Sequence, residues 1–247
     1  MIITGHKAPL VEPNDDLFMV LSKTLLDVKD KSIIIVSSKI VSLCQGQVVP
    51  LDTNKRQLIA SECEWYLPAD SNPFNSTITI TGHKLAAAAG IDESNAHNCF
   101  VLLPKNTKKV AQQIRQWAID TFTIIDVGVV IIDSRSIPLN LGTVGQALAY
   151  DGIQPLKDYR GTNDLFGREI LVSRLSTINC LASAAILVMG EGTEQMPVAV
   201  ITDTNISFTD TVTEPLDYPL DQDLYSQLLK SEKWIKGGGN YLSRQTS

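Results

Sequence analysis

Two short apolar runs of β-branched residues constrain the fold of this chain more than any other feature. Ser32–Ser37 reads Ser-Ile-Ile-Ile-Val-Ser, and residues 127–132 read Val-Gly-Val-Val-Ile-Ile immediately before Asp133. Such runs favour strands that are buried on both faces, as in sheets covered by helices. The remaining strand and helix patterns mix without a strict alternation and without an internal repeat. We therefore expect an α+β or mixed α/β fold.

The chain is expected to form a single domain over residues 1–247 with two interlocked subdomains, because no Pro/Gly-rich linker divides it. Candidate subdomain boundaries lie near residues 67–76 and 134–142. Residues 237–247, which begin with three glycines, are expected to be a loose tail. Among the local patterns, residues 142–150 favour a short helix and residues 169–172 a strand.

Composition excludes several classes of protein. The formal net charge is -6 and no basic stripe is present, so nucleic acid is not an expected partner. The longest apolar runs are too short to span a bilayer, and the first residues do not resemble a signal peptide. The four cysteines show no CxxC spacing, which favours reduced, structural thiols. We expect a cytoplasmic protein without a membrane partner.

Three acidic residues stand at the ends of apolar runs, where loops are expected. They are Asp92, Asp133 and Glu191. Carboxylates that converge after folding would bind a hard cation, which in enzymes usually accompanies phosphate. Each residue also has a structural interpretation. Asp92 could form an Asx-turn or a helix N-cap, Asp133 could initiate a turn, and Glu191 could lie at a solvated loop tip between two glycines.

A loop that carries two aspartates and two arginines offers further candidates. Arg160 and Arg168 could orient a phosphate or carboxylate of a substrate through paired hydrogen bonds, which would make them catalytic residues. The alternative is a structural network in which they pair with Asp158 and Asp164 of the same loop. Neither GxxxxGK[ST] nor GxGxxG after a strand is present, so no standard nucleotide-binding motif decides between these interpretations.

Taken together, the motifs resemble the family of GTP-dependent γ-glutamyl ligases that add glutamate to the deazaflavin coenzyme F-420, the CofE family. The resemblance extends from Pro9 to about Ile201 and includes the order and spacing of the motifs. The closest matches are Gly90-Ile91-Asp92 with Ser94-Asn95, Lys157-Asp158-Tyr159 with Gly161, Asp164-Leu165-Phe166-Gly167-Arg168-Glu169, and Met189-Gly190-Glu191-Gly192. The resemblance implies a CofE-like fold.

The resemblance also implies a reaction and a set of site residues. In the family, GTP phosphorylates a carboxylate of the acceptor cofactor, and the amine of L-glutamate attacks the acyl phosphate to form an amide. Mg²⁺ or Mn²⁺ bridges the phosphates. The family is dimeric and cytoplasmic. Carried over to this chain, the metal ligands are Asp92, Asp133, Ser134 and Glu191, and the nucleotide contacts are Pro9, Leu10, Ser38, Asn95, Met189, Gly190 and Gly192.

Several positions depart from the family pattern. A phosphate-facing lysine of the family is replaced by Leu43, although Lys39 lies nearby and could substitute for it. Arg135 could replace a lost arginine, while Gln45 and Asn179 differ from the residues expected there. These departures leave three functions open: a ligase acting on the F-420 precursor, a γ-glutamyl ligase acting on a folate tail, and a non-catalytic relative that binds nucleotide or metal.

Overall fold

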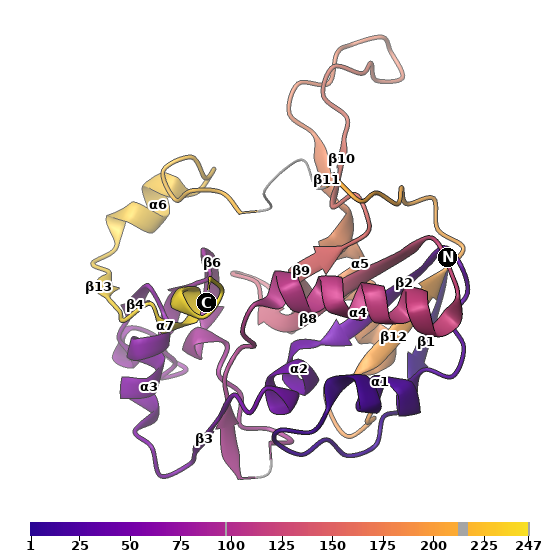
Figure 1. Ribbon diagram of the computed structural model, residues 1–247. Helices are drawn as coiled ribbons and strands as arrows, with labels where there is room; N and C mark the ends of the chain where they lie inside the picture. Colours follow the sequence, from indigo (N-terminus) through magenta and orange to yellow (C-terminus); the bar gives the residue numbers. More distant parts are fainter. Residues whose placement is uncertain (97, 212–216, 247) are drawn as a thin grey trace.

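A five-stranded sheet with the strand order β1-β12-β2-β8-β9 forms the centre of the computed structural model, which describes residues 1–96, 98–211 and 217–246 (Figure 1). The two apolar runs are its central strands: β2 (Ser32–Ser37) pairs in parallel with β8 (Val127–Ser136). The other pairs are antiparallel, with β1 (Ile2–His6) on β12 (Val198–Thr202), β12 on β2, and β9 (Thr143–Asp151) on β8.

Helices cover both faces of this sheet, which explains why its central strands are apolar throughout. In β2, Ile34 and Val36 belong to one hydrophobic cluster, whereas Ile33 and Ile35 belong to the other. The first cluster includes residues of α1 (Leu17–Thr24), α2 (Ser38–Cys44) and α4 (Thr107–Phe122), and the second includes residues of α5 (Thr177–Met189).

A smaller antiparallel sheet, with the order β13-β4-β5-β6, lies beside the central one. A third hydrophobic cluster, which includes Ile59, Phe100 and Leu102, packs around α3. The elements outside the central sheet and its covering helices are β3 (Val48–Pro50), α3 (Lys55–Glu62), β4 (Trp65–Leu67), η1 (Ala69–Ser71), β5 (Ile78–Thr81), β6 (Lys84–Ala87), η2 (Ala88–Gly90), β7 (Cys99–Val101), β10 (Leu156–Asp158), β11 (Arg174–Ser176), α6 (Ser226–Ser231), β13 (Ile235–Lys236) and α7 (Asn240–Ser243).

The predicted α+β class is confirmed, since helices and both sheets mix along the chain. Two local predictions are wrong. Residues 142–150 form most of strand β9 and not a helix, because they pair with β8 along its length. Residues 169–172 contain one isolated bridge at Glu169, and the strand of this region is β11. In the described part of the chain, no helix combines the length and apolarity needed to cross a membrane.

The C-terminal residues are packed, which corrects the prediction of a loose tail over residues 237–247. Tyr241 of α7 is buried, and both terminal nitrogens of Arg244 bond to the carboxylate of the buried Glu62. The side-chain oxygen of Gln245 accepts hydrogen bonds from the backbone and hydroxyl of Thr107. Residue 247 lies outside the described residues. Packing of this segment against α3 and α4 therefore holds the end of the chain.

Candidate active site

The sheet register brings four separate segments to one edge. Ser37 at the end of β2 lies opposite Ile132 in β8, so the residues that follow both parallel strands emerge together. Val198 at the start of β12 pairs with the end of β2 and with His6 at the end of β1. The carboxyl edge of parallel strands is where α/β sheets usually bind ligands. The topology therefore concentrates loop residues at one place.

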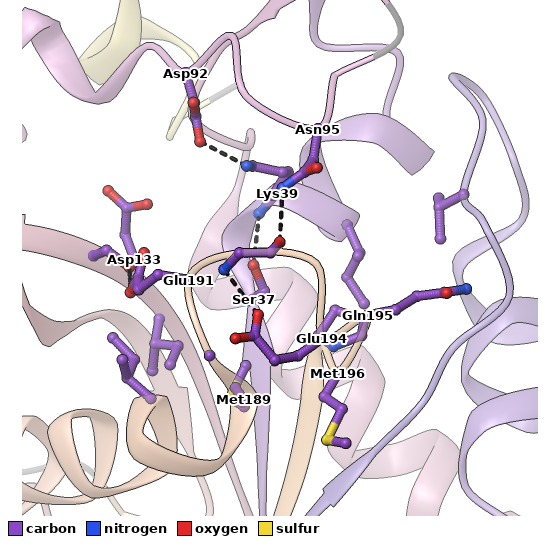
Figure 2. Close-up of a pocket in the computed structure, with 18 of the residues that line it drawn as sticks. Ser37, Lys39, Asp92, Asn95, Asp133, Met189, Glu191, Glu194, Gln195 and Met196 are labelled. Carbon is purple, nitrogen blue, oxygen red and sulfur yellow. Dashed lines mark hydrogen bonds and ion pairs between the residues drawn. The ribbon is translucent and has the colours of Figure 1, made fainter.

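A cavity of about 540 Å³ lies at this edge. Figure 2 shows its side chains entering from the start of α2, the turn after η2, the end of β8 and the loop after α5. Most of the sequence-predicted site residues line it: Pro9, Leu10, Lys39, Asp92, Asn95, Asp133, Ser134, Met189, Gly190, Glu191 and Gly192.

Asp92 is held in the cavity by a lysine and by its own turn. Its carboxylate lies 2.6 Å from Lys39 Nζ and accepts a 2.8 Å hydrogen bond from the backbone N–H of Ser94. The second contact is an Asx-turn, which is the structural role considered for Asp92 in the sequence. The same side chain also lines the cavity. Partial burial would raise the pKa of Asp92, but the hydrogen bonds from Lys39 and Ser94 outweigh burial and hold the pKa below its ordinary value.

Asp133 has the opposite environment. Side chains alternate along β8, so Asp133 and Arg135 share one face of the strand and Ser134 points to the other. Asp133 accepts a 3.1 Å hydrogen bond from Ser38 Oγ and lies 3.0 Å from Arg135 Nε. Burial raises the pKa of Asp133, and the nearby charge of Asp92 adds to this effect, whereas Arg135 and Ser38 oppose it.

Glu191 lies in a tight turn that follows α5. Gly190 has a φ of 76°, and a Cβ on it would come within 2.2 Å of the Glu194 side chain, so this position requires glycine. The Glu191 carboxylate accepts a hydrogen bond from Ser134 Oγ. Across the turn, Asn95 Nδ2 donates a 3.0 Å hydrogen bond to the carbonyl of Gly192. The acidic turn is thereby fixed to β8 on one side and to the segment after η2 on the other.

The charges and donor atoms of the cavity fit a hard cation by their chemistry. Asp92, Asp133, Glu191 and Glu194 bring four carboxylates to its lining, and Lys39 is the only cationic side chain among the described residues there. Carboxylate and hydroxyl oxygens are the ligands that Mg²⁺ and Mn²⁺ favour. Within the described ranges no three acids already converge on one point, because neighbouring side chains hold the carboxylates individually.

Three predicted site residues lie outside the cavity lining. Ser38 is directly behind it and acts through its hydrogen bond to Asp133. Arg160 and Arg168 belong to the segment between β10 and β11, which projects from the body of the fold (Figure 1). Arg160 pairs with Asp158 at 2.6 Å, and its hydrogen bonds lower the pKa of that carboxyl to about 2. Within one chain, the structure does not bring these arginines to the acidic residues.

Two further polar side chains that line the cavity were not predicted from the sequence. Glu194 lines the cavity and accepts a 2.8 Å hydrogen bond from the backbone of Gly192. Gln195 also lines it, and its amide donates a 2.8 Å hydrogen bond to the carbonyl of Ala8, which joins two of the loops. For Glu194, the signal available in the sequence was its position immediately after the glycine-bearing motif. Gln195 offered none, because its partner is 187 residues away in sequence.

The departures from the family pattern have local structural explanations. Leu43 is buried in the main hydrophobic cluster, and Lys39, one helical turn earlier, places its amine at the cavity instead. The amide of Gln45 exchanges two hydrogen bonds with the backbone of Lys105. Asn179 accepts from the backbone of Ala147 and so attaches α5 to β9.

Comparison with known proteins finds similar sequences over most of the chain. Residues 5–203 match the model of the family described as F420-0:Gamma-glutamyl ligase. The chain is 31% identical, over 91% of its length and 97% of the relative, to the coenzyme F420:L-glutamate ligase of Methanococcus maripaludis strain C7. It is 30% identical to the enzyme of that name from Methanocaldococcus jannaschii, over 90% of this chain and 96% of the relative. It is 31% identical to that of Haloarcula marismortui, over 79% of this chain and 84% of the relative.

Proposed function

The chain belongs to the F420-0:gamma-glutamyl ligase family of amide-forming ligases, and from this premise we propose that it attaches L-glutamate to a carboxylate of the coenzyme F420 precursor. One observation carries the proposal. Asp92, Asp133 and Glu191, which are far apart in sequence, line a single cavity at the carboxyl edge of the central sheet. Asp133 lies within β8 and not in the turn expected there, and a structural role alone would not require this strand and two separate turns to present their carboxylates to one space.

We propose GTP as the co-substrate, with its phosphates directed towards these acids. Support comes from the segments around the cavity, namely the Pro9–Leu10 loop, Lys39 and the glycine turn after Met189. Lys39 Nζ contacts Asp92 and the carbonyl of Ser94 in this structure, so it is already positioned at the acidic cluster. It would supply the cationic donor that Leu43 cannot.

We further propose that Asp92, Asp133, Ser134 and Glu191 hold Mg²⁺ or Mn²⁺ together with the nucleotide. A bound divalent cation would supply positive charge against the oxygens of the transferred phosphoryl group. The carboxylates would then exchange their present partners for the cation, which frees Lys39 to face phosphate. Arg135 and Ser38 would keep Asp133 oriented from behind.

The reaction then follows in two displacements. An oxygen of the acceptor carboxylate attacks the γ-phosphorus of GTP, and GDP leaves, so that an acyl phosphate forms. The amine of L-glutamate attacks the acyl carbon, and the bond from that carbon to the phosphate oxygen breaks. An amide, inorganic phosphate and a proton are released.

A homodimer is part of the proposal. The segment between β10 and β11 exposes large apolar side chains at its projecting end, including Leu165 and Phe166. Contiguous exposed apolar residues of this kind commonly mark a protein interface. A second copy of the chain would cover them, and in such a dimer Arg160 or Arg168 would reach a substrate bound to the partner. The expected cytoplasmic location remains a proposal.

Phosphate release and product mass test the proposed function directly. The purified protein is incubated with Mg²⁺ or Mn²⁺, GTP or ATP, and L-glutamate, with F420-0, with dihydrofolate or with neither. We expect phosphate release that depends on F420-0 and a product heavier by one glutamyl unit. Glutamylation of dihydrofolate alone would establish the folate alternative. Metal-dependent binding of GTP without any turnover would establish the non-catalytic alternative.

A further inference from the structure

A second cavity, of about 490 Å³, lies beyond the active-site acids along β8. Asp133 lines the first cavity and Arg135, two residues later on the same face of the strand, lines the second. The linings of the two cavities therefore meet at the ion pair between these side chains, which lie 3.0 Å apart. The other walls of the second cavity come from the turn between β5 and β6, the start of α4, and α7.

Arg135 is unusual in being a buried cation with spare hydrogen-bonding capacity. Its side chain is only 6% exposed, and within the described chain its Nη1 has no hydrogen-bond partner. Its Nε lies 3.0 Å from Asp133, but the two groups lack the alignment of a hydrogen bond. Buried donors are almost always satisfied, so an unpaired guanidinium nitrogen beside a cavity indicates a missing acceptor.

The rest of the lining is also suited to an anion. Lys108 and Lys109 stand in the first turn of α4 at the mouth of the cavity, and the described residues provide no carboxylate partner for either. Backbone N–H groups in the first turn of a helix lack partners within the helix and favour negative charge. Lys84 is also present, but Asp217, the one acidic residue of the lining, neutralises it.

We propose that this second cavity binds a phosphate or carboxylate group of the glutamate-accepting substrate, with Arg135, Lys108 and Lys109 as the binding residues. The inference rests on the proposed ligase function. The acceptor must present its reacting carboxylate at the first cavity, next to Asp133, while the remainder of the molecule needs space nearby. The second cavity supplies that space, because it begins on the other side of the Asp133–Arg135 ion pair.

An anion bound in the second cavity also explains why the guanidinium group of Arg135 lies beside that cavity. An oxyanion in the second cavity gives Nη1 an acceptor and leaves the charge of Asp133 for the first cavity. Arg135 thereby positions Asp133 and binds the acceptor with different nitrogens of one guanidinium group, a division of roles that lysine could not perform.

Steady-state kinetics of a double variant test the proposal. Lys108→Gln/Lys109→Gln removes two exposed charges without touching the core, and the matched control is Lys23→Gln/Lys29→Gln, which removes two exposed charges near α1. We expect the first variant to raise the KM for F420-0 by about ten-fold, because two charge-assisted contacts are lost. The KM for GTP and kcat should stay within about two-fold of the wild type, and the control should match the wild type throughout.

Calorimetric titration of F420-0 into the protein without nucleotide provides a readout that is independent of turnover. The affinity for F420-0 should fall by the same factor in the Lys108/Lys109 variant and not in the control. An unchanged KM and affinity for F420-0 would overturn the proposal, and so would an increase in the KM for L-glutamate alone, which would make this cavity the glutamate site. Absence of ligation by the wild-type protein would instead refute the proposed function.

Discussion

At the scale of single residues, the two aspartates of the cavity contribute to stability with opposite signs. The pKa of Asp92 is lowered by Lys39 and Ser94, so its ionised form stabilises the fold above the ordinary value of 3.8, and this contribution is lost as the pH falls through the folded pKa. The pKa of Asp133 is raised by burial, so its ionisation costs stability as the pH rises through 3.8 to the folded pKa.

Isosteric amide variants separate these effects from catalysis. We expect Asp92→Asn and Asp133→Asn each to reduce ligase turnover by about a hundred-fold or more, because each removes a proposed metal ligand. At neutral pH, Asp92→Asn should unfold at a lower temperature than the wild type. Relative to Asp133→Asn, the wild type should lose stability as the pH rises from 3.8 to the folded pKa of Asp133, because only the wild type ionises a buried carboxyl group there.

Thermal unfolding from about pH 2 to about pH 8 measures both variants, with the exposed Asp27→Asn as a control for the loss of one charge. The difference in stability between wild type and Asp92→Asn should shrink as the pH falls. A variant of Asp133 that keeps full turnover would contradict its role as a ligand. A stability difference between the wild type and Asp133→Asn that changes with pH in the opposite direction would contradict the sign assigned to the pKa of Asp133.

The acidic residues that line the cavity could be selected as candidates from the sequence because each one follows an apolar run. The environments that give Asp92 and Asp133 opposite pKa shifts could not, since their partners come from other elements. Lys39 is 53 positions from Asp92, and Arg135 is close to Asp133 only because side chains alternate along β8. Local sequence patterns thus locate the acidic residues but not the neighbouring groups that shift their pKa values.

At the scale of elements, the contact between β9 and α5 depends on the absence of a side chain. A Cβ on Gly145 would come within 2.3 Å of the backbone carbon and oxygen of Ala182, and backbone atoms cannot move aside cheaply. We expect Gly145→Ala to destabilise the protein by about 2 kcal/mol, because the helix must shift away from the sheet. Chemical denaturation of the purified variant measures this change.

Gly142→Ala is the matched control for that substitution. Gly142 has a φ of 87°, and no heavy atom lies within 4 Å of the position where its Cβ would be. The control should therefore cost roughly 1 kcal/mol from backbone strain alone. Equal losses in the two variants would show that close packing of α5 on β9 is not what requires glycine at position 145.

The same small residues explain why residues 142–150 were predicted to be helical. The buried positions of β9 include Gly145, Ala147 and Ala149, which are weakly hydrophobic, and a register shift places Ala147 and Ala149 in different hydrophobic clusters, so the two-residue alternation of a strand is not visible. The central strands β2 and β8 were predictable because their β-branched residues are unambiguous. Small residues that permit close packing thus hide the strand pattern from which β9 could have been recognised.

The ion pair between α3 and the C-terminal segment provides a second test at this scale. Arg244 donates a 2.9 Å hydrogen bond to the carboxylate of the buried Glu62. Arg244→Met should destabilise the protein by about 3 kcal/mol, because it leaves a buried charge without its partner. The double variant Glu62→Gln/Arg244→Met should recover most of this loss in the same unfolding assay. No recovery would show that Arg244 stabilises the fold through other contacts.

At the scale of the whole molecule, the sequence predicted the convergence of acidic loops but not the boundaries of the site. Parallel pairing of β2 and β8 was sufficient to place Asp133 at a ligand-binding edge. The second cavity was not predictable, because it requires the C-terminal residues, which were expected to be loose, to pack beside α4. The second cavity therefore depends on long-range packing of the C-terminal segment, whose sequence has no clear hydrophobic pattern.

The projecting segment between β10 and β11 carries the last prediction, which concerns oligomeric state. Leu165 is 99% exposed and Phe166 is 94% exposed. Exposure of two large apolar side chains to water is unfavourable, and a second copy of the chain would bury both of them. We expect the wild-type protein to sediment as a dimer and Leu165→Ser/Phe166→Ser to sediment as a monomer. Leu26→Ser, in the segment after α1, removes a leucine that is 85% exposed and should leave the dimer intact.

Activity of the monomeric variant then decides whether the arginines of the segment act across the interface. If Arg160 or Arg168 contacts substrate on the partner, the monomer should lose turnover while its cavity still binds GTP, because no residue of the cavity has changed. A fully active monomer would confine the substrate site to one chain and remove both arginines from it. A dimeric Leu165→Ser/Phe166→Ser protein would show that the interface, if one forms, lies elsewhere on the surface.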